Sequence, residues 1–104
     1  MATAYRRGYN FEDRCRKALE RLGYVVVRSA GSKGPADLVA LRDGVVLLVQ
    51  CKLDHGLFDA KERIKLLETA SLAGAIPVLA EREKERGPIN WTRLDGGKDV
   101  EGLA

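Results

Sequence analysis

The chain contains 104 residues, a length that supports one domain with one modest hydrophobic core, so we expect no second domain. Hydrophobic residues make up 45% and charged residues 32%, which is typical of a globular protein and excludes fibrous and disordered classes. The 18 Lys and Arg against 15 Asp and Glu give a net charge of +3, far below that of histone-like proteins. The longest apolar run, 45–49, is too short for the roughly 20 residues that span a bilayer, so we expect no membrane segment.

The first third of the chain is basic. Residues 1–9 are expected to form a loose basic arm, and Asn10 is a suitable N-cap for a helix over 11–22, where apolar residues recur at helical spacing. The basic side chains here are Arg6, Arg7, Arg14, Arg16, Lys17, Arg21, Arg28 and Lys33. They predict a positive face that meets phosphates, although a solvated helix surface explains the same pattern.

Three strands are expected next. The β-branched stretch 24–29 predicts the first, and the loop 31–34 follows it. Two further strands, 36–42 and 45–52, are joined by Asp43-Gly44, a dipeptide that strongly favours a two-residue hairpin turn.

A second helix is expected over 59–73, since Asp59 and Glu62 form a capping-box variant and Gly74 stops the pattern. Its apolar face is predicted to contain Ile64, Leu67 and Ala70.

The last third of the chain predicts two strands. Residues 75–80 form the first, with Pro77 at a strand start or sheet edge, and 88–94 form the second after a charged, solvated turn over 81–87. Residues 95–104 are expected to be a flexible tail.

The order of these elements is helix, three strands, helix, two strands. It predicts an α/β sandwich in which two helices flank a central mixed five-stranded β-sheet, built as a single domain over 1–94.

The hairpin brings polar groups together. A two-residue turn pairs Arg42 with Val45, and the same register sets Asp37 opposite Gln50. Lys52 shares their face because side chains alternate along a strand. The sequence therefore predicts a carboxylate, an amide and an ammonium at one edge of the core.

The first helix offers a second carboxylate. Glu12 lies about 20° around the helix axis from Leu19, at the margin of the apolar stripe, by the roughly 100° per residue of an α-helix. With Asp37, Gln50 and a backbone carbonyl it would make the hard oxygen site that Mg²⁺ prefers. An ion there, beside the Lys52 ammonium, suits phosphodiester hydrolysis.

Each residue also has a purely structural explanation. Asp37 and Gln50 can form a simple hydrogen-bonded pair, Lys52 can be a solvated strand end, and Glu12 near a helix N-terminus is favourable through the helix dipole alone. Cys15 and Cys51 lie in apolar patterns without metal-type spacing and are expected to be reduced core residues.

Two quoted segments suggest a family. "RRGYNFEDRCRKALERLGYVVVRSAGSKGPADLVAL" followed by "LVQCK" resembles the archaeal and viral Holliday junction resolvases of the PD-(D/E)XK nuclease superfamily, over roughly residues 5–80. The resemblance implies the restriction-endonuclease-like form of the α/β sandwich. Two departures are visible, since Gln50 stands where the family motif has an acid and the proline of "PAD" lies two places before Asp37.

The resemblance also assigns roles. Glu12, Asp37, Gln50 and the backbone carbonyl of Cys51 would hold Mg²⁺ or Mn²⁺, and Lys52 would assist the attacking water. Ser32 matches a loop serine near the scissile phosphate. The residues expected to bind DNA are Arg6, Arg7, Arg14, Arg28 and Lys33.

By this resemblance the chain is expected to be a cytoplasmic endonuclease, or one of the host cytoplasm if a virus encodes it, that acts in DNA recombination and repair. It would resolve four-way DNA junctions as a homodimer, because symmetric cuts need two sites. Two alternatives stay open. One is another nuclease of the superfamily (restriction, repair or flap nicking), and the other is a junction-binding module without catalysis, suggested by Gln50.

Overall fold

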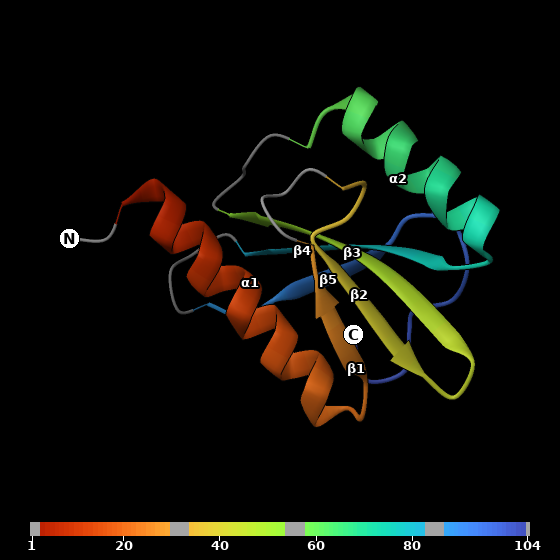
Figure 1. The fold of residues 1–104 in the computed structure, drawn as a ribbon, viewed down its shortest axis with the longest axis horizontal. Coiled ribbons are helices and arrows are strands. Elements are labelled where there is room, and N and C mark those ends of the chain that lie inside the picture. Colours follow the sequence, from red (N-terminus) through yellow and green to blue (C-terminus); the bar gives the residue numbers. More distant parts are fainter. Residues whose placement is uncertain (1–2, 30–33, 54–57, 83–86, 104) are drawn as a thin grey trace.

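The computed structural model describes residues 3–29, 34–53, 58–82 and 87–103, which form a mixed five-stranded sheet with one helix on each side (Figure 1). The elements are α1 (Ala4–Arg21), β1 (Val25–Arg28), β2 (Leu38–Arg42), β3 (Val45–Leu53), α2 (Ala60–Ala73), β4 (Ile76–Arg82) and β5 (Asn90–Arg93). The strands lie in chain order across the sheet; β3 and β4 are parallel and the other neighbours antiparallel. The predicted sheet and its two helices are confirmed. Within the described ranges, neither helix combines the length and apolarity needed to cross a bilayer.

α1 is longer than its sequence pattern predicted. It begins at Ala4, where the Thr3 hydroxyl accepts a hydrogen bond from the Arg6 N–H at 3.1 Å. The expected loose arm is therefore wrong for residues 4–9, and Asn10 is an interior residue rather than the N-cap. Thr3 caps a helix nearly as well as asparagine does, and Gly8 costs only about 1 kcal/mol within a helix, so the helix continues.

The sheet is covered differently on its two faces. Phe11, Cys15 and Leu19 of α1 are buried against one face, whereas Leu66 and Ala70 of α2 pack on the other face. The apolar face predicted for α2 is wrong at Ile64, which is 54% exposed. The buried stripe instead steps by four residues through Leu66 and Ala70, so the helix is rotated relative to the prediction.

The tail and the charged segment after β4 also differ from expectation. Leu103 is buried in the core and Val100 packs against it, so the predicted flexible tail is wrong at these positions. Their apolar side chains gain more from the core than from water. β4 runs through Glu81 and Arg82, which had been assigned to a turn, and residues 83–86 of that turn lie outside the described ranges.

The hairpin between β2 and β3 has the predicted register. Asp43 and Gly44 have φ values of 49° and 78°, the two left-handed conformations of a tight hairpin turn. Arg42 pairs with Val45, and the ladder continues to Leu38 opposite Val49. This local reversal fixes which residues meet at the far end of the two strands.

We expect Gly44→Ala to lower the free energy of unfolding by about 1–2 kcal/mol, because an L-residue is disfavoured in the left-handed region. Gly8→Ala is the matched control: its added methyl group meets no atom within 4 Å, and it should stabilise α1 by up to about 1 kcal/mol. Urea unfolding of both variants measures the difference. Equal effects of the two substitutions would contradict this account of the turn.

Candidate active site

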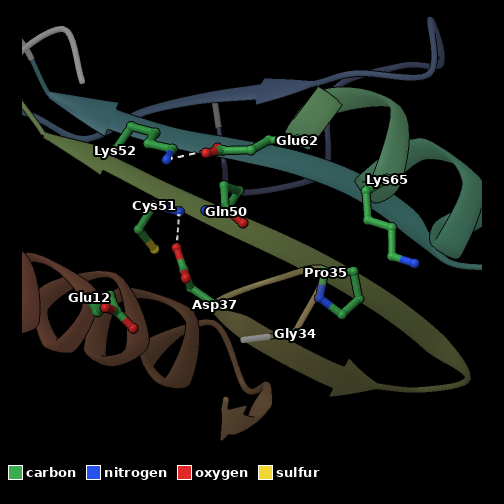
Figure 2. Close-up of a pocket in the computed structure, with 9 residues that line it drawn as sticks. All are labelled: Glu12, Gly34, Pro35, Asp37, Gln50, Cys51, Lys52, Glu62 and Lys65. Atoms are coloured by element: carbon green, nitrogen blue, oxygen red, sulfur yellow. Dashed lines mark hydrogen bonds and ion pairs between the residues drawn. The ribbon is translucent and has the colours of Figure 1, made fainter. Parts of the chain in front are cut away.

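A polar pocket lies at the end of the hairpin away from its turn, between the two helices (Figure 2). It receives side chains from α1, from the segment before β2, from β3 and from α2. The residues that line it are Glu12, Gly34, Pro35, Asp37, Gln50, Cys51, Lys52, Glu62 and Lys65. All four residues that sequence reasoning placed around a cation, together with Lys52, are among them.

Asp37 is held against the backbone of β3. Its N–H donates to the Val49 carbonyl at 2.9 Å, and its Oδ2 accepts from the Cys51 N–H at 2.8 Å. These two bonds flank Gln50, so Asp37 lies across from it as the register predicted. Counted from the turn, the regular ladder of β2 and β3 ends at the pair of Leu38 and Val49, just before Asp37 is reached. The Asp37 carboxylate takes the place of a main-chain acceptor for the Cys51 N–H.

Strand alternation separates the remaining β3 side chains. Cys51 packs with the core under α1, and the residues on either side of it, Gln50 and Lys52, point to the opposite face. Contact with Cys15, together with burial, raises the pKa of the Cys51 thiol well above its usual value. Both cysteines are free, as expected for core thiols, and the high pKa argues against Cys51 as a nucleophile.

Glu12 reaches the pocket from α1. It directly follows the buried Phe11, and its side chain is only 19% exposed. Burial raises the pKa of Glu12, the negative charge of Asp37 raises it further, and Arg28 opposes both effects. The Arg28 Nε lies 3.8 Å from Glu12 Oε1, a distance that leaves the carboxylate incompletely neutralised.

Asp37 has a similar electrostatic problem. Its residue is 6% exposed, and burial raises its pKa despite the Cys51 N–H and the Lys52 ammonium, which lower it. The surroundings therefore disfavour the ionised form of both Glu12 and Asp37. A cation bound between them would stabilise that ionised form. The oxygen donors of this pocket therefore fit a hard divalent ion.

Carboxylates alone do not complete that donor set. Within the ranges that the structure describes, no three His, Cys, Asp or Glu side chains are grouped so that they could hold a metal ion. A cation between Glu12 and Asp37 would need the Gln50 amide oxygen, a backbone carbonyl and water to fill its coordination sphere. Gln50 keeps an oxygen ligand at this place but brings no charge.

Sequence reasoning did not find Glu62 as a site residue. Its Oε2 lies 2.8 Å from the Lys52 Nζ, so α2 contributes a carboxylate to the pocket (Figure 2). From the sequence, Glu62 was assigned only to the capping box at the start of the second helix. The available signal was its spacing, because Glu62 precedes Leu66 by four residues and Ala70 by eight, which places a charge on the buried stripe of α2.

The predicted DNA-binding residues lie in different settings. Arg28 stacks on the Tyr9 ring with its guanidinium 4.3 Å from the ring centroid, and its Nε and Nη2 are buried without a hydrogen-bond partner. Arg14 donates to the Gly87 carbonyl at 2.6 Å. Arg6 and Arg7 are exposed on the first turns of α1. Ser32 and Lys33 lie outside the described residues.

Comparisons with known proteins agree with this geometry. The family model of the archaeal Holliday junction resolvases (Hjc) matches residues 3–98. The crossover junction endodeoxyribonuclease Hjc of Methanocaldococcus jannaschii is 42% identical over 83 residues, which cover 77% of this chain and 62% of that protein. The solved structure of Archaeoglobus fulgidus Hjc, described as a Holliday junction resolvase, superposes with a TM-score of 0.73 at 24% identity over 84% of this chain and 72% of that one.

The structural likeness defines a restriction-endonuclease-like fold, as the resemblance implied. The family match extends over nearly the whole chain, and the chain belongs to the archaeal Holliday junction resolvase family. It spans 62% of the length of the Methanocaldococcus relative.

Asp37→Asn is expected to raise the melting temperature in chelator at pH 7, because the amide still accepts from the Cys51 N–H and removes a buried charge. A raised folded pKa means that ionisation of Asp37 destabilises the fold above that pKa. The advantage of the variant should therefore shrink as the pH falls towards the ordinary value of 3.8. Added Mg²⁺ should stabilise wild type more than the variant. Calorimetry measures the melting temperatures at pH 7, their change with pH and their change with Mg²⁺. A variant that is less stable than wild type at pH 7 would contradict the argument.

Proposed function

We propose that the chain is an endonuclease that recognises four-way DNA junctions and hydrolyses their phosphodiester bonds with the help of Mg²⁺ or Mn²⁺. The observation that carries the proposal is the pocket in which Glu12, Asp37, Gln50 and Lys52 meet, in a chain of the archaeal resolvase family. The name of the Methanocaldococcus relative supports the same substrate class. DNA recombination and repair are the processes that this activity serves.

The residues of the pocket have two different proposed roles, metal binding and activation of the attacking water. Glu12, Asp37, Gln50 and the Cys51 carbonyl would hold the cation. When bound, the cation supplies positive charge where the phosphoryl group gains negative charge and helps to activate water. Lys52 holds its ammonium beside these ligands, orients the attacking water and offsets negative charge on the phosphate.

Basic residues on the α1 side would bind the DNA backbone. Arg28 is the best supported, because its Nε and Nη2 have no hydrogen-bond partner, lie 3.8 Å from Glu12 and Asp13 respectively, and suit a phosphate oxygen. Arg6 and Arg7 extend the basic surface along α1, and Arg14 keeps Nη1 without a hydrogen-bond partner. Ser32 and Lys33 remain proposals from the sequence alone.

A homodimer is part of the proposal. Paired cuts in opposed strands require two symmetry-related sites, and each chain brings Glu12, Asp37, Gln50 and Lys52 together in one pocket. An apolar surface supports association: Val25 and Val27 of β1 are 66% and 53% exposed, and Leu41 of β2, which pairs with Val25, is 39% exposed. Strand alternation puts these side chains on the α2 face of the sheet, next to the area that α2 covers.

Cleavage of a labelled four-way junction in Mg²⁺ tests the activity. Asp37→Ala and Lys52→Ala should each lower the single-turnover rate by about 100-fold or more, since the first removes a proposed ligand of the cation and the second removes positive charge beside the reacting phosphate. Lys61→Ala, an exposed substitution on α2, is the matched control and should cut like wild type. Full activity of both pocket variants would exclude this pocket as the catalytic site.

The same assay separates the alternatives. Preference for linear duplex over junction at equal salt would indicate a different nuclease activity on this fold. Tight junction binding without cleavage, and without Mn²⁺ binding in calorimetry, would indicate a non-catalytic module.

Sedimentation analysis tests the dimer. Wild type should sediment as a dimer, and Val27→Asp should shift it towards monomer because a buried unpaired carboxylate opposes association. Leu72→Asp is the control, since Leu72 is 90% exposed but belongs to α2 and not to the sheet surface formed by Val25, Val27 and Leu41. A monomeric wild type, or equal dissociation by both variants, would contradict the proposed surface.

A further inference from the structure

The ion pair between Lys52 and Glu62 joins β3 to α2 at the edge of the pocket (Figure 2). The Nζ–Oε2 distance is 2.8 Å, and the Lys52 side chain is only 20% exposed. The Glu62 side chain is 42% exposed as a whole, but its Oε2 atom is buried without a hydrogen bond, so the contact with Lys52 is an ion pair alone. An ion pair to a partly buried lysine limits a side chain that otherwise has considerable rotamer freedom.

α2 fixes the place of Glu62. The Asp59 Oδ1 accepts a hydrogen bond from the Glu62 N–H at 2.8 Å, which holds the first turn of the helix. One turn further on, Leu66 is fully buried, and Ala70 follows it on the same stripe. Glu62 therefore begins this stripe, and its Oε2 atom is buried beside the Lys52 ammonium.

On the sheet, Glu81 of β4 is the register partner of Lys52, but the ion pair that the structure shows for Lys52 is with Glu62. Asp37 is bound to the Cys51 N–H, and Glu12 lies on the α1 side of the sheet near Arg28. On β3 itself, the position two residues before Lys52 is the neutral Gln50 where the family motif has an acid. The carboxylate partner that β3 lacks comes from α2 instead.

We propose that Glu62 is a positioning residue for Lys52, which keeps the ammonium ordered beside the reacting phosphate and supplies the negative charge absent at Gln50. This inference rests on the proposed nuclease function. Glu62 acts through Lys52 and does not bind DNA, because a carboxylate repels phosphate. The negative charge of Glu62 also acts on the proposed cation ligands, because it raises the pKa of Asp37.

A double-mutant cycle in single-turnover junction cleavage tests the role. Glu62→Gln should lower the cleavage rate by about tenfold, the order expected when a catalytic group loses its orientation. In a Lys52→Ala background the same substitution should have no further effect, because its target is gone. Junction binding in chelator should not weaken, since the variant removes a negative charge. Glu68→Gln, on an exposed turn of α2, is the matched control and should cut like wild type.

Gln50→Glu provides a rescue that a merely structural role would not give. It places a carboxylate on the face of Lys52, two residues along β3. In the Gln50→Glu background, the loss caused by Glu62→Gln should shrink to less than about threefold, measured against Gln50→Glu alone. Additive losses in both cycles, or wild-type cutting by Glu62→Gln, would overturn the inference and leave the nuclease proposal intact.

A second measurement does not depend on activity. The NMR order parameter of the Lys52 ammonium should fall in Glu62→Gln and stay unchanged in Glu68→Gln, with melting temperatures measured for both. If wild type fails to cut any junction, the proposed function fails, and the order parameter still decides whether Glu62 orders Lys52. An order parameter that is equal in wild type and Glu62→Gln would overturn the inference in every case.

Discussion

The hydrogen bond from the Cys51 N–H to the Asp37 carboxylate is the point at which the fold and the candidate site depend on each other. It exists because the Asp43-Gly44 turn sets the register of β2 and β3, so that the last residue before β2 meets the last part of β3. An acceptor is required there, since a buried N–H without a partner costs about 1–3 kcal/mol. The same carboxylate thus completes the hydrogen bonding at this end of the sheet and offers its remaining oxygen lone pairs to a ligand.

This double use carries an electrostatic penalty. Glu12 and Asp37 approach each other from α1 and from the start of β2, and burial together with mutual repulsion raises the pKa of Glu12. Arg28 and Lys52 compensate only in part, from opposite sides of the pair. A fold selected for stability alone would place apolar or neutral groups at such an edge. The conflict is therefore better explained by a bound cation than by packing, which connects the stability of the metal-free chain to its proposed chemistry.

The part of the site that depends on local backbone geometry could be predicted from the sequence, and the part that depends on the packing of α2 could not. A two-residue turn and strand alternation are sufficient to bring Asp37, Gln50 and Lys52 together. Glu62 was missed because its orientation depends on the rotation of α2 about its axis, and the sequence pattern had assigned the buried face to Ile64. Leu103 was missed for a related reason, since Val100 and Leu103 are isolated among polar and glycine residues of the tail, where no periodic pattern indicates that the core accepts them.

The distribution of charge over separate elements gives the site two parts with different supports. The groups proposed to hold the cation belong to α1 and the β2–β3 hairpin, whereas the orientation of Lys52 depends on α2 through Glu62. In a strand that carried an acid at position 50, the acid and the lysine would be fixed together by one backbone. Here a displacement of α2 relative to the sheet would disturb Lys52 and leave Glu12 and Asp37 in place. With Gln50 in the place of the strand acid, the packing of α2 therefore becomes a part of the proposed catalytic geometry.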